Sequence, residues 1–435
     1  MSSTSVLLTA PPTTAERAAP CRFEIQRGAA GLAAVRVDWQ RLCDGLGGAR
    51  CFQRPEWYES YLRSLADGEL CFCLARRNDL LVGVFPVVQT TRTLGGLRLR
   101  SLELVNHPHL LLADCVFAPT DANRRLLVDW LAFLRHEARL AWDVVVLANL
   151  LEDGCALPAL RAGPRAADVL VERSRCDYLP CVPLDELAAG LSRNFRGNLR
   201  KARNKLQKLS GLEYVAARRP AELDAALSQF LEVEASGWKG ATGTGTAIQL
   251  QPRVRAFYRA LVDTFGRSGA CEINLLRAER HCLAGQFCLR TGDTSFMLKI
   301  GYDEAYAPVA PGNMLLEYTL RRYVDAGDIK SINLVTDADW HASWKPQSLA
   351  VSDVYLFNQT IAGLTALGLT RVRQQMGRAY RARLKPLIAR LRNGHARAAQ
   401  TDPTASANPH ARKQAGASAD RPVAPGCQET NDDCE

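Results

Sequence analysis

Residues 74–85 read LARRNDLLVGVF, and residues 276–287 read LRAERHCLAGQF. The second stretch lies 202 positions after the first, and four of the twelve aligned residues are identical. Each stretch has two short apolar runs on either side of a polar turn, which is typical of a β-hairpin. Chance could produce four identities, but each hairpin also follows a predicted helix with an adjacent aromatic pair, at 57–58 and at 257–258. The repeated context predicts a duplicated α/β unit.

Hydrophobic periodicity and turn residues predict the remaining elements. We expect helices over residues 23–63, 123–138, 196–209, 220–237, 252–268, 313–326 and 360–391. We expect strands over residues 70–76, 80–89, 97–105, 110–117, 143–148, 213–217, 272–277, 283–290, 295–302, 331–335 and 351–357. Helices and strands alternate in both halves, so the predicted class is α/β (α+β mixed), with mixed sheets flanked by helices.

The composition excludes fibrous and wholly disordered classes. Among 435 residues, 47% are hydrophobic and 23% are charged, and this length predicts two or three domains. No apolar run reaches the ~18 residues that a membrane-spanning helix needs. The 14 cysteines include no Cys-x-x-Cys pair. Because no secretory signal is found at the N-terminus either, we expect reduced thiols and no bound metal.

The net charge of +10 comes from two segments. Residues 193–208 contain seven cations and no acid, and residues 371–397 contain nine cations and no acid. Without these 16 cations the chain keeps 39 basic residues against 45 acidic residues. Each segment is either a solvated helix face or a surface that attracts an anionic ligand.

Residues 295–317, SFMLKIGYDEAYAPVAPGNMLLE, carry the strongest local signal for a binding site. A predicted strand ends at Tyr302, and Pro311-Gly312-Asn313 then opens a helix. Backbone N–H groups at a helix start attract anions, and a glycine lets a ligand come close to the backbone. The segment suits a pyrophosphate or an acyl carbonyl, although the same three residues also form ordinary helix-start turns.

Two further loops combine aromatic and charged residues. The loop 237–247, GWKGATGTGTA, could hold a phosphate or form a flexible surface loop. The segment 340–345, WHASWK, could line a pocket or pack as an ordinary turn. His107 and His109 have no third metal ligand nearby in the sequence. The chain has no Gly-x-Ser-x-Gly motif, so a covalent nucleophile is not supported.

Five motifs together resemble the GNAT superfamily, in its FemAB-like branch that includes the cellulose-biosynthesis CelD-type acyltransferases. They occur in that family's order: FQRPEW at 52–57, LELVNHPHLLLAD at 102–114, NFRGNLRKAR at 194–203, SGWKG with GTAI at 236–248, and KIGYDE with PG at 299–312. The resemblance covers residues 22–358. Two departures are a longer loop after Lys239 and Ala310 in place of the family's serine.

The resemblance implies two tandem GNAT-like units followed by a C-terminal helix. We expect the first unit over residues 21–185, with a degenerate site because it has no Pro-Gly helix start. The acyltransferase unit is expected over residues 186–358. The remaining segments are a disordered leader over 1–20, a basic amphipathic helix over 359–393 and a disordered tail over 394–435.

The resemblance also implies direct transfer of an acyl group from acetyl-CoA or another acyl-CoA, with no metal. Such an enzyme holds an amine or hydroxyl acceptor against the thioester carbonyl and stabilises the oxyanion with a backbone N–H or a cation. A carboxylate or a water molecule removes the proton. The candidate catalytic residues are Lys299, Asp303 and Lys345. The candidate donor-binding residues are Pro311, Gly312, Asn313, Met314, Trp238 and Lys239.

The predicted function is that of a cytoplasmic N- or O-acetyltransferase with a small or glycan acceptor, in extracellular polysaccharide or envelope synthesis. Two alternatives stay open. The first is a FemAB-type aminoacyl transferase that uses charged tRNA, which the basic segments favour and the lack of an aromatic-and-basic RNA-binding module disfavours. The second is a non-catalytic, GNAT-derived accessory subunit of a polysaccharide synthase.

The C-terminal helix has one apolar stripe that includes Ile361, Leu364, Val372 and Met376. Its first half has no charge before Arg371 and should pack on the acyltransferase core. The second half carries too many cations to be buried. We therefore expect it to face solvent or to bind an anionic membrane peripherally, at the inner membrane face.

Overall fold

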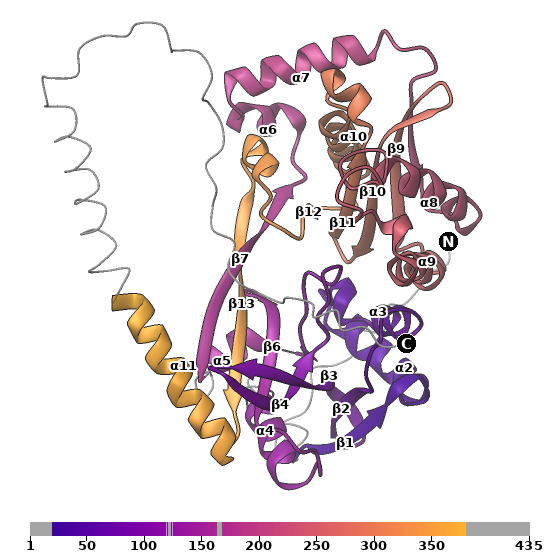
Figure 1. Cartoon of the computed structure of the whole chain (residues 1–435). Coiled ribbons are helices and arrows are strands. Elements are labelled where there is room, and N and C mark those ends of the chain that lie inside the picture. The colour runs from indigo at the N-terminus through magenta and orange to yellow at the C-terminus, as the bar shows by residue number, and fades with distance from the viewer. Residues whose placement is uncertain (1–19, 119, 121–122, 124, 163–167, 380–435) are drawn as a thin grey trace, which may run out of the picture. The chain divides into compact units, whose positions relative to one another are not determined.

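The computed structural model describes residues 20–118, 120, 123, 125–162 and 168–379 (Figure 1). The chain divides into two compact units, Met1–Val372 and Arg373–Glu435. The boundary falls inside helix α11 (Ile361–Ala379), so the described part of the second unit is the end of that helix. The predicted leader apart from Pro20, the helix beyond Ala379 and the predicted tail lie outside the described residues.

The first unit contains the described strands and nearly all of the described helices. The strands are β1 (Arg22–Arg27), β2 (Leu70–Arg77), β3 (Leu80–Leu94), β4 (Leu97–Leu104), β5 (Val116–Phe117), β6 (Val144–Leu151), β7 (Val169–Pro180), β8 (Glu213–Ala217), β9 (Cys271–Ala278), β10 (His281–Thr291), β11 (Thr294–Tyr302), β12 (Ser331–Asn333) and β13 (Gln347–Phe357). The α-helices are α2 (Gly28–Gly45), α3 (Pro55–Leu62), α4 (Leu126–His136), α5 (Ala156–Ala162), α6 (Leu184–Gly190), α7 (Arg193–Leu206), α8 (Pro220–Glu234), α9 (Pro252–Gly266) and α10 (Pro311–Ala326). Short 3₁₀ turns are η1 (Cys51–Gln53), η3 (Ile248–Leu250), η4 (Glu304–Val309) and η5 (Asp339–Trp344).

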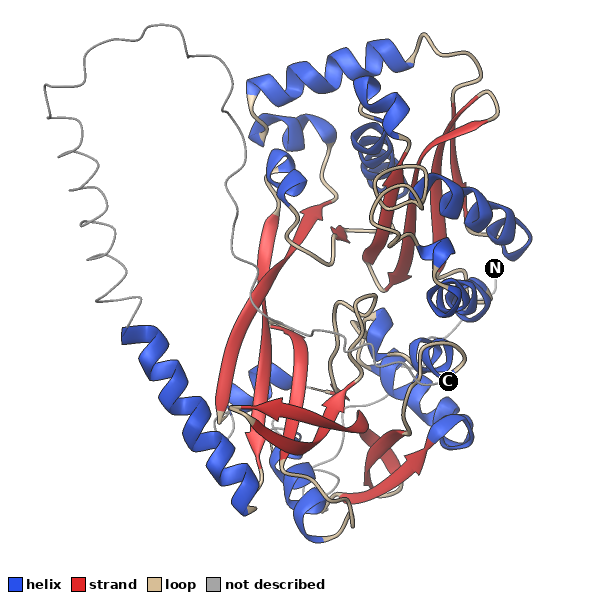
Figure 2. Cartoon of the chain, in the orientation of Figure 1, coloured by secondary structure: helices blue, strands red, loops and turns tan. Residues whose placement is uncertain are grey.

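The strands form one mixed sheet of 13 strands. Their order is β1-β2-β3-β4-β6-β13-β7-β12-β11-β10-β9-β8, and β5 pairs with β3. Two pairs, β4 with β6 and β11 with β12, are parallel, and the other pairs are antiparallel. Helices flank the sheet (Figure 2). The predicted mixed α/β class with a C-terminal helix is confirmed.

Strands β7 and β13 join the two halves of the sheet. The last strand in sequence, β13, inserts between β6 and β7. The end of β7, Tyr178–Pro180, pairs in turn with β12. Strand segments of each half therefore pair with the other half, and the predicted boundary between residues 185 and 186 falls inside α6. That boundary stays a prediction.

The two duplicated helices pack against each other. Trp57 of α3 and Phe257 of α9 meet edge to face, with ring centroids 5.5 Å apart. The hydroxyls of Ser60 and Thr264 lie 2.9 Å apart in the same buried contact. All four side chains are buried, so the two halves share one continuous apolar core.

Three strands of the structure differ from what the sequence predicted. Residues 23–26, predicted as helix, belong to β1, which pairs with β2 along its whole length. The predicted strand 110–117 is reduced to Val116–Phe117, because the buried Asp114 carboxylate instead accepts backbone N–H groups at the start of α5. Strand β7 is absent from the predicted elements, because its charged residues at alternate positions obscure the apolar pattern.

Helix α11 packs on the sheet through a different face from the one predicted. Ala366 is fully buried in a cluster with Tyr355 and Phe357 of β13. Gly363 permits this approach, since an added Cβ would lie 2.5 Å from the Asn358 carbonyl oxygen. The first half of the helix thus packs on the core as predicted, through Ala366 and the partly buried Leu367, although most of the predicted apolar stripe is exposed. The exposed apolar side chains of the helix are Ile361, Leu364, Leu369, Val372 and Met376.

Within the described ranges, no helix combines the length and the apolar character needed to cross a bilayer.

Candidate functional site

Strands β11 and β12 run parallel and then separate. They pair only over Thr294–Phe296 and Ser331–Asn333, and β11 continues to Tyr302 while β12 ends. Leu298 is an extra residue of β11, because Met297 pairs with Cys288 and Lys299 pairs with the preceding residue of β10. Such a bulge changes the face toward which the following side chains point. In the described chain, the outer edge of β11 beyond the paired segment faces no strand.

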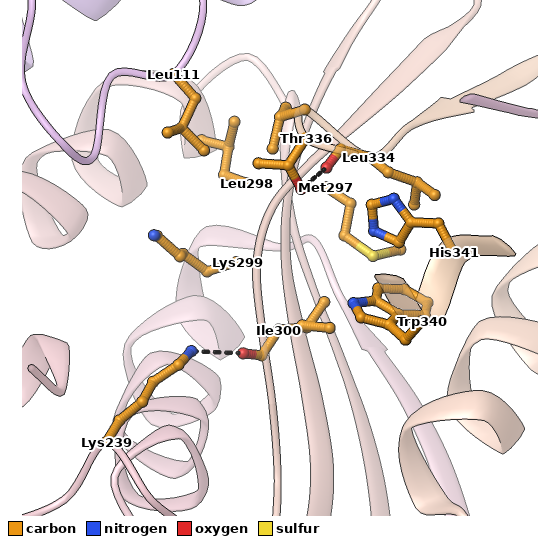
Figure 3. A pocket seen from close by; sticks show the side chains of 11 residues that line it. Leu111, Lys239, Met297, Leu298, Lys299, Ile300, Leu334, Thr336, Trp340 and His341 are labelled. Atoms are coloured by element: carbon orange, nitrogen blue, oxygen red, sulfur yellow. Dashed lines mark hydrogen bonds between the residues drawn. The ribbon is translucent and has the colours of Figure 1, made fainter. Parts of the chain in front are cut away.

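A pocket of about 130 Å³ lies where the two strands separate (Figure 3). Its lining residues are Leu111, Lys239, Met297, Leu298, Lys299, Ile300, Leu334, Val335, Thr336, Trp340 and His341. Strand β11 and the segment after β12 supply most of the wall, and Leu111 comes from the first half of the chain. The volume is smaller than the ~300–1,000 Å³ of a typical small-molecule site. It fits the reactive end of a longer ligand.

A buried carboxylate holds Lys239 at this pocket. The Lys239 Nζ lies 3.2 Å from Glu234 Oε1 and donates a hydrogen bond to the Ile300 carbonyl oxygen at 3.4 Å. The other oxygen of Glu234 accepts the Ile248 N–H at 2.9 Å. Gly301 lets α8 approach β11 closely, since an added Cβ would lie 2.6 Å from the Glu234 Cα. These contacts fix Lys239 at the edge of β11.

Lys299 is a cation without a direct ion pair, because the Glu234 carboxylate that attracts it is paired with Lys239. Its ammonium group has no ion pair or hydrogen bond to any described residue. Burial, followed by the nearby charge of Lys239, lowers the pKa of Lys299 from 10.5 to about 8. A partly buried, unpaired charge is costly. The position therefore favours a ligand or a reaction intermediate that brings negative charge.

Two histidines from the first half of the chain lie near Lys299. His109 Nδ1 lies 3.4 Å from the Tyr258 hydroxyl, and the His107 and His109 rings are 5.7 Å apart. Burial, with the charge of Lys299 next, lowers the pKa of His109 to about 3. Burial also lowers the pKa of His107, so both rings are neutral near pH 7. No group of three His, Cys, Asp or Glu side chains that could hold a metal is found among the described residues.

The start of α10 offers backbone N–H groups without side-chain caps. Ala310 precedes the helix with a φ of 45° and makes no capping hydrogen bond through its side chain. Pro311 has no N–H group, and the N–H groups of Gly312 and Asn313 have no acceptor within the first turn. The Asn313 side chain is fixed, because its Oδ1 accepts the Trp344 Nε1–H at 2.9 Å. This helix start has the chemistry of an anion site.

The first basic segment forms α7, which contacts both η4 and α10. Leu199, Ala202 and Leu206 are buried, which confirms the predicted apolar stripe. Arg203 forms an ion pair with Glu317 of α10. The exposed cations of this segment that pair with no described residue are Arg193, Arg196, Arg200, Lys201, Lys205 and Lys208. A cationic surface therefore lies on the helix that packs against α10.

Comparison with protein families matches residues 193–345 to the model described as "Acetyltransferase (GNAT) domain". This match supports, over residues 193–345, the resemblance to the GNAT superfamily that the motifs predicted. No curated protein matches the chain in sequence.

The likeness to solved structures extends beyond residues 193–345. FemX is 13% identical, with a TM-score of 0.50, over 76% of this chain and 98% of FemX. L-PGS from Bacillus licheniformis is 11% identical, with a TM-score of 0.47, over 77% of this chain and 96% of its own. A tandem GNAT protein from the clavulanic acid biosynthesis pathway is 13% identical, with a TM-score of 0.36, over 77% of this chain and 98% of its own. The likeness to FemX shows the fold alone.

Two of the predicted site residues, Lys299 and Lys239, line the pocket. Asp303 is not part of the lining, and its carboxylate caps η4 by accepting a backbone N–H two residues on at 2.9 Å. Lys345 is exposed at the end of η5, with a φ of 54°. Trp238 is 60% exposed, and its ring centroid lies 5.7 Å from Lys239 Nζ.

Trp340 and His341 also line the pocket. They belong to the segment 340–345, for which the sequence left two alternatives open, a pocket wall and an ordinary turn. Trp344 of the same segment is buried instead. No motif marks Asp177, whose Oδ2 lies 2.9 Å from His341 Nδ1. The two residues are 164 positions apart, and only the pairing of β7 with β12 and β13 brings them together.

Proposed function

We propose that this protein transfers an acyl group, an acetyl group in the simplest case, from a CoA thioester to an amine or hydroxyl acceptor. The observation that carries the proposal is the unpaired Lys299 ammonium in a pocket where β11 and β12 separate. A space of about 130 Å³ fits a thioester rather than a whole cofactor. A cation there stabilises the negative charge that develops on the carbonyl oxygen.

The start of α10 supports binding of the donor's polar part. The free N–H groups of Gly312 and Asn313 suit a pyrophosphate, and buried Pro311 and Met314 anchor the first turn. The unpaired cations of α7 raise the local concentration of a polyanion such as CoA. Lys239 lines the pocket, and the exposed Trp238 ring beside it offers a surface to the donor.

The chemistry requires few groups once the reactants are aligned. The acceptor nitrogen or oxygen attacks the thioester carbonyl carbon, and Lys299, with the N–H of the bulged Leu298, stabilises the oxyanion. The carbon–sulfur bond then breaks and releases CoA. The pocket does not include Asp303 or Lys345, whose catalytic roles stay predictions.

Isothermal titration calorimetry with a panel of acyl-CoA thioesters tests the proposal. At least one thioester should bind with a Kd in the micromolar range. Desulfo-CoA binding more weakly than the intact thioester would show that the reactive end contributes. If no acyl-CoA binds to the folded protein, the proposal fails.

Two other functions use the same surfaces differently. A FemAB-type aminoacyl transferase would use the α7 cations for the phosphate backbone of charged tRNA. Filter binding with aminoacylated tRNA, compared with the same tRNA uncharged, tests this reading. A non-catalytic accessory subunit of a polysaccharide synthase would bind neither donor.

The resemblance to CelD-type acyltransferases supports an acceptor in extracellular polysaccharide or envelope synthesis, modified on the cytoplasmic side. Helix α11 supports a place near the inner membrane face. Its exposed Ile361, Leu364 and Val372 lie directly before and within the segment that carries nine cations and no acid. An exposed apolar face beside such a segment favours an anionic bilayer, where each cation contributes about 1 kcal/mol.

Liposome co-sedimentation tests this contact. Full-length protein should pellet with vesicles that contain an anionic lipid at low salt. The variant Leu364→Asp with Val372→Asp should stay in solution, because both side chains are exposed and their replacement spares the fold. Equal sedimentation of both proteins would show that α11 does not bind the membrane.

A further inference from the structure

His341 lines the pocket (Figure 3) and forms a buried pair with Asp177, which lies behind it and is not part of the lining. His341 is 2% exposed and Asp177 is 6% exposed. Asp177 lies on β7, and its backbone is fixed by hydrogen bonds with Thr336 and Leu334, which belong to the segment after β12. The pair thus stands where the two halves of the sheet join.

Both oxygens of the Asp177 carboxylate are used. Oδ2 lies 2.9 Å from His341 Nδ1, and Oδ1 accepts the Ser348 hydroxyl of β13. A carboxylate at Nδ1 holds the proton on that nitrogen and leaves the lone pair on Nε2. In the described chain, the imidazole ring of His341 makes no hydrogen bond other than the one to Asp177. Nε2 is therefore available to a molecule in the pocket.

The surroundings of His341 place it on the donor side of the pocket. Its turn, η5, is fixed to the start of α10 by the hydrogen bond from Trp344 to Asn313. Met297 lines the pocket beside His341 and belongs to the same core cluster as Trp344. The bulged Leu298 packs against a different core cluster, on the other side of β11. Lys299 and His341 thus reach one small pocket from different faces of the strand.

We propose that His341 is the proton carrier of the acyl transfer and that Asp177 is its positioning residue. The inference rests on the proposed function. Nε2 takes the proton from the acceptor N–H or O–H as the new bond to the carbonyl carbon forms. It returns that proton to the CoA sulfur as the carbon–sulfur bond breaks. One proton moves, no other reactant is needed, and the imidazolium formed in between is stabilised by the Asp177 carboxylate.

The charged groups around His341 are compatible with this role. Asp177 faces it from β7, Lys299 and Lys239 line the same pocket from β11 and the loop after α8, and Asp339 and Lys345 belong to its own turn. Of these groups, Asp177 contacts the imidazole ring directly.

Release of the CoA thiol from acetyl-CoA, with water as acceptor, tests the inference across pH. Wild-type activity should fall as pH decreases, as expected of a reaction that needs a base. His341→Gln should lower the rate by about 100-fold or more and remove this acid limb. Asp177→Asn should lower the rate and move the limb, while His281→Gln, an exposed histidine on a hairpin turn, should change neither.

Two further measurements separate a catalytic role from a structural one. Calorimetry should give the same acetyl-CoA affinity for His341→Gln as for wild type, which shows an intact donor site. Diethyl pyrocarbonate should modify Nε2 of His341, and acetyl-CoA should protect it. A His341→Gln variant with wild-type rate and pH profile, or a His341 that stays unmodified while His281 reacts, overturns the inference. Loss of all acyl-CoA binding in the wild type would instead overturn the proposed function, and the inference with it.

Discussion

Replacing Lys299 should remove both activity and a specific feature of its pH dependence. The structure lowers the pKa of this lysine to about 8 through burial and the charge of Lys239. A group with that pKa is about 90% cationic at pH 7 and about 10% cationic at pH 9. If the cation stabilises the oxyanion, the wild-type rate should fall about 10-fold between these two pH values.

The variant Lys299→Met keeps the length of the side chain and removes the charge. Loss of one oxyanion donor typically costs ~100- to 1,000-fold in rate, so Lys299→Met should lose that much at pH 7. Its remaining rate should no longer fall toward pH 9. In Lys239→Met, the falling limb should move to higher pH, because the charge that lowers the pKa of Lys299 is gone.

The assay is single-turnover release of the CoA thiol, followed with a thiol-reactive dye between pH 7 and pH 9. Lys330→Met is the matched control, since this lysine is exposed and pairs only with Asp293 at the surface. A wild-type rate that stays level or rises toward pH 9 would refute the assigned role of Lys299. So would a Lys299→Met rate within about 3-fold of the Lys330→Met rate, a difference of under ~0.7 kcal/mol.

Three further predictions concern donor binding and the shared core. Gly312→Val should weaken acyl-CoA binding by ~10-fold or more, about 1.4 kcal/mol. The fold should be kept, because an added Cβ meets only Tyr302 at 3.8 Å. An unchanged affinity in calorimetry would show that the donor does not bind at this helix start. Arg196→Glu with Arg200→Glu should raise the Kd for acyl-CoA, more strongly at low salt; an effect that is absent at every salt concentration leaves α7 with a structural role. Phe257→Ala should lower the free energy of unfolding by about 3–5 kcal/mol in urea titration, whereas the exposed Val37→Ala should change it by less than about 0.5 kcal/mol.

Arg203 is unsuitable for the charge-reversal test, although it lies in the same basic segment. Its guanidinium pairs with Glu317 of α10, so reversing its charge would disturb the packing of α7 on the helix that starts the donor site. The sequence alone does not separate it from its exposed neighbours. Only the packing of the two helices shows which cations are free.

Local patterns predicted most of the helices and hairpins. Elements with a clear period and a marked boundary, such as α8 after Pro220 and the hairpin of β9 and β10, lie close to their predicted positions. Strand β7 was not predicted, because its charged side chains interrupt the apolar alternation. Its pairing with β12 and β13 makes it a strand nonetheless. Pairing with distant strands determines the conformation of β7, and the local sequence pattern does not reveal such pairing.

The site was predictable only where one contiguous stretch carries it. Lys299 and the start of α10 belong to residues 295–317, and the strand followed by a Pro-Gly helix start marks them. Asp303 lies in the same stretch, yet its carboxylate is used by its own turn. The proximity of Asp177 to His341 and of His109 to Tyr258 depends on long-range strand pairing and on packing between the two halves. Spacing in the sequence contains no such information.

The most direct test of the central claim is calorimetry of the full chain with acetyl-CoA and longer acyl-CoA thioesters. We expect one donor per chain, bound at the pocket where β11 and β12 separate, with a Kd in the micromolar range. It also predicts that Gly312→Val raises this Kd while Lys330→Met does not. A folded wild-type protein that binds no acyl-CoA, or that binds it equally well with valine at position 312, would contradict the account.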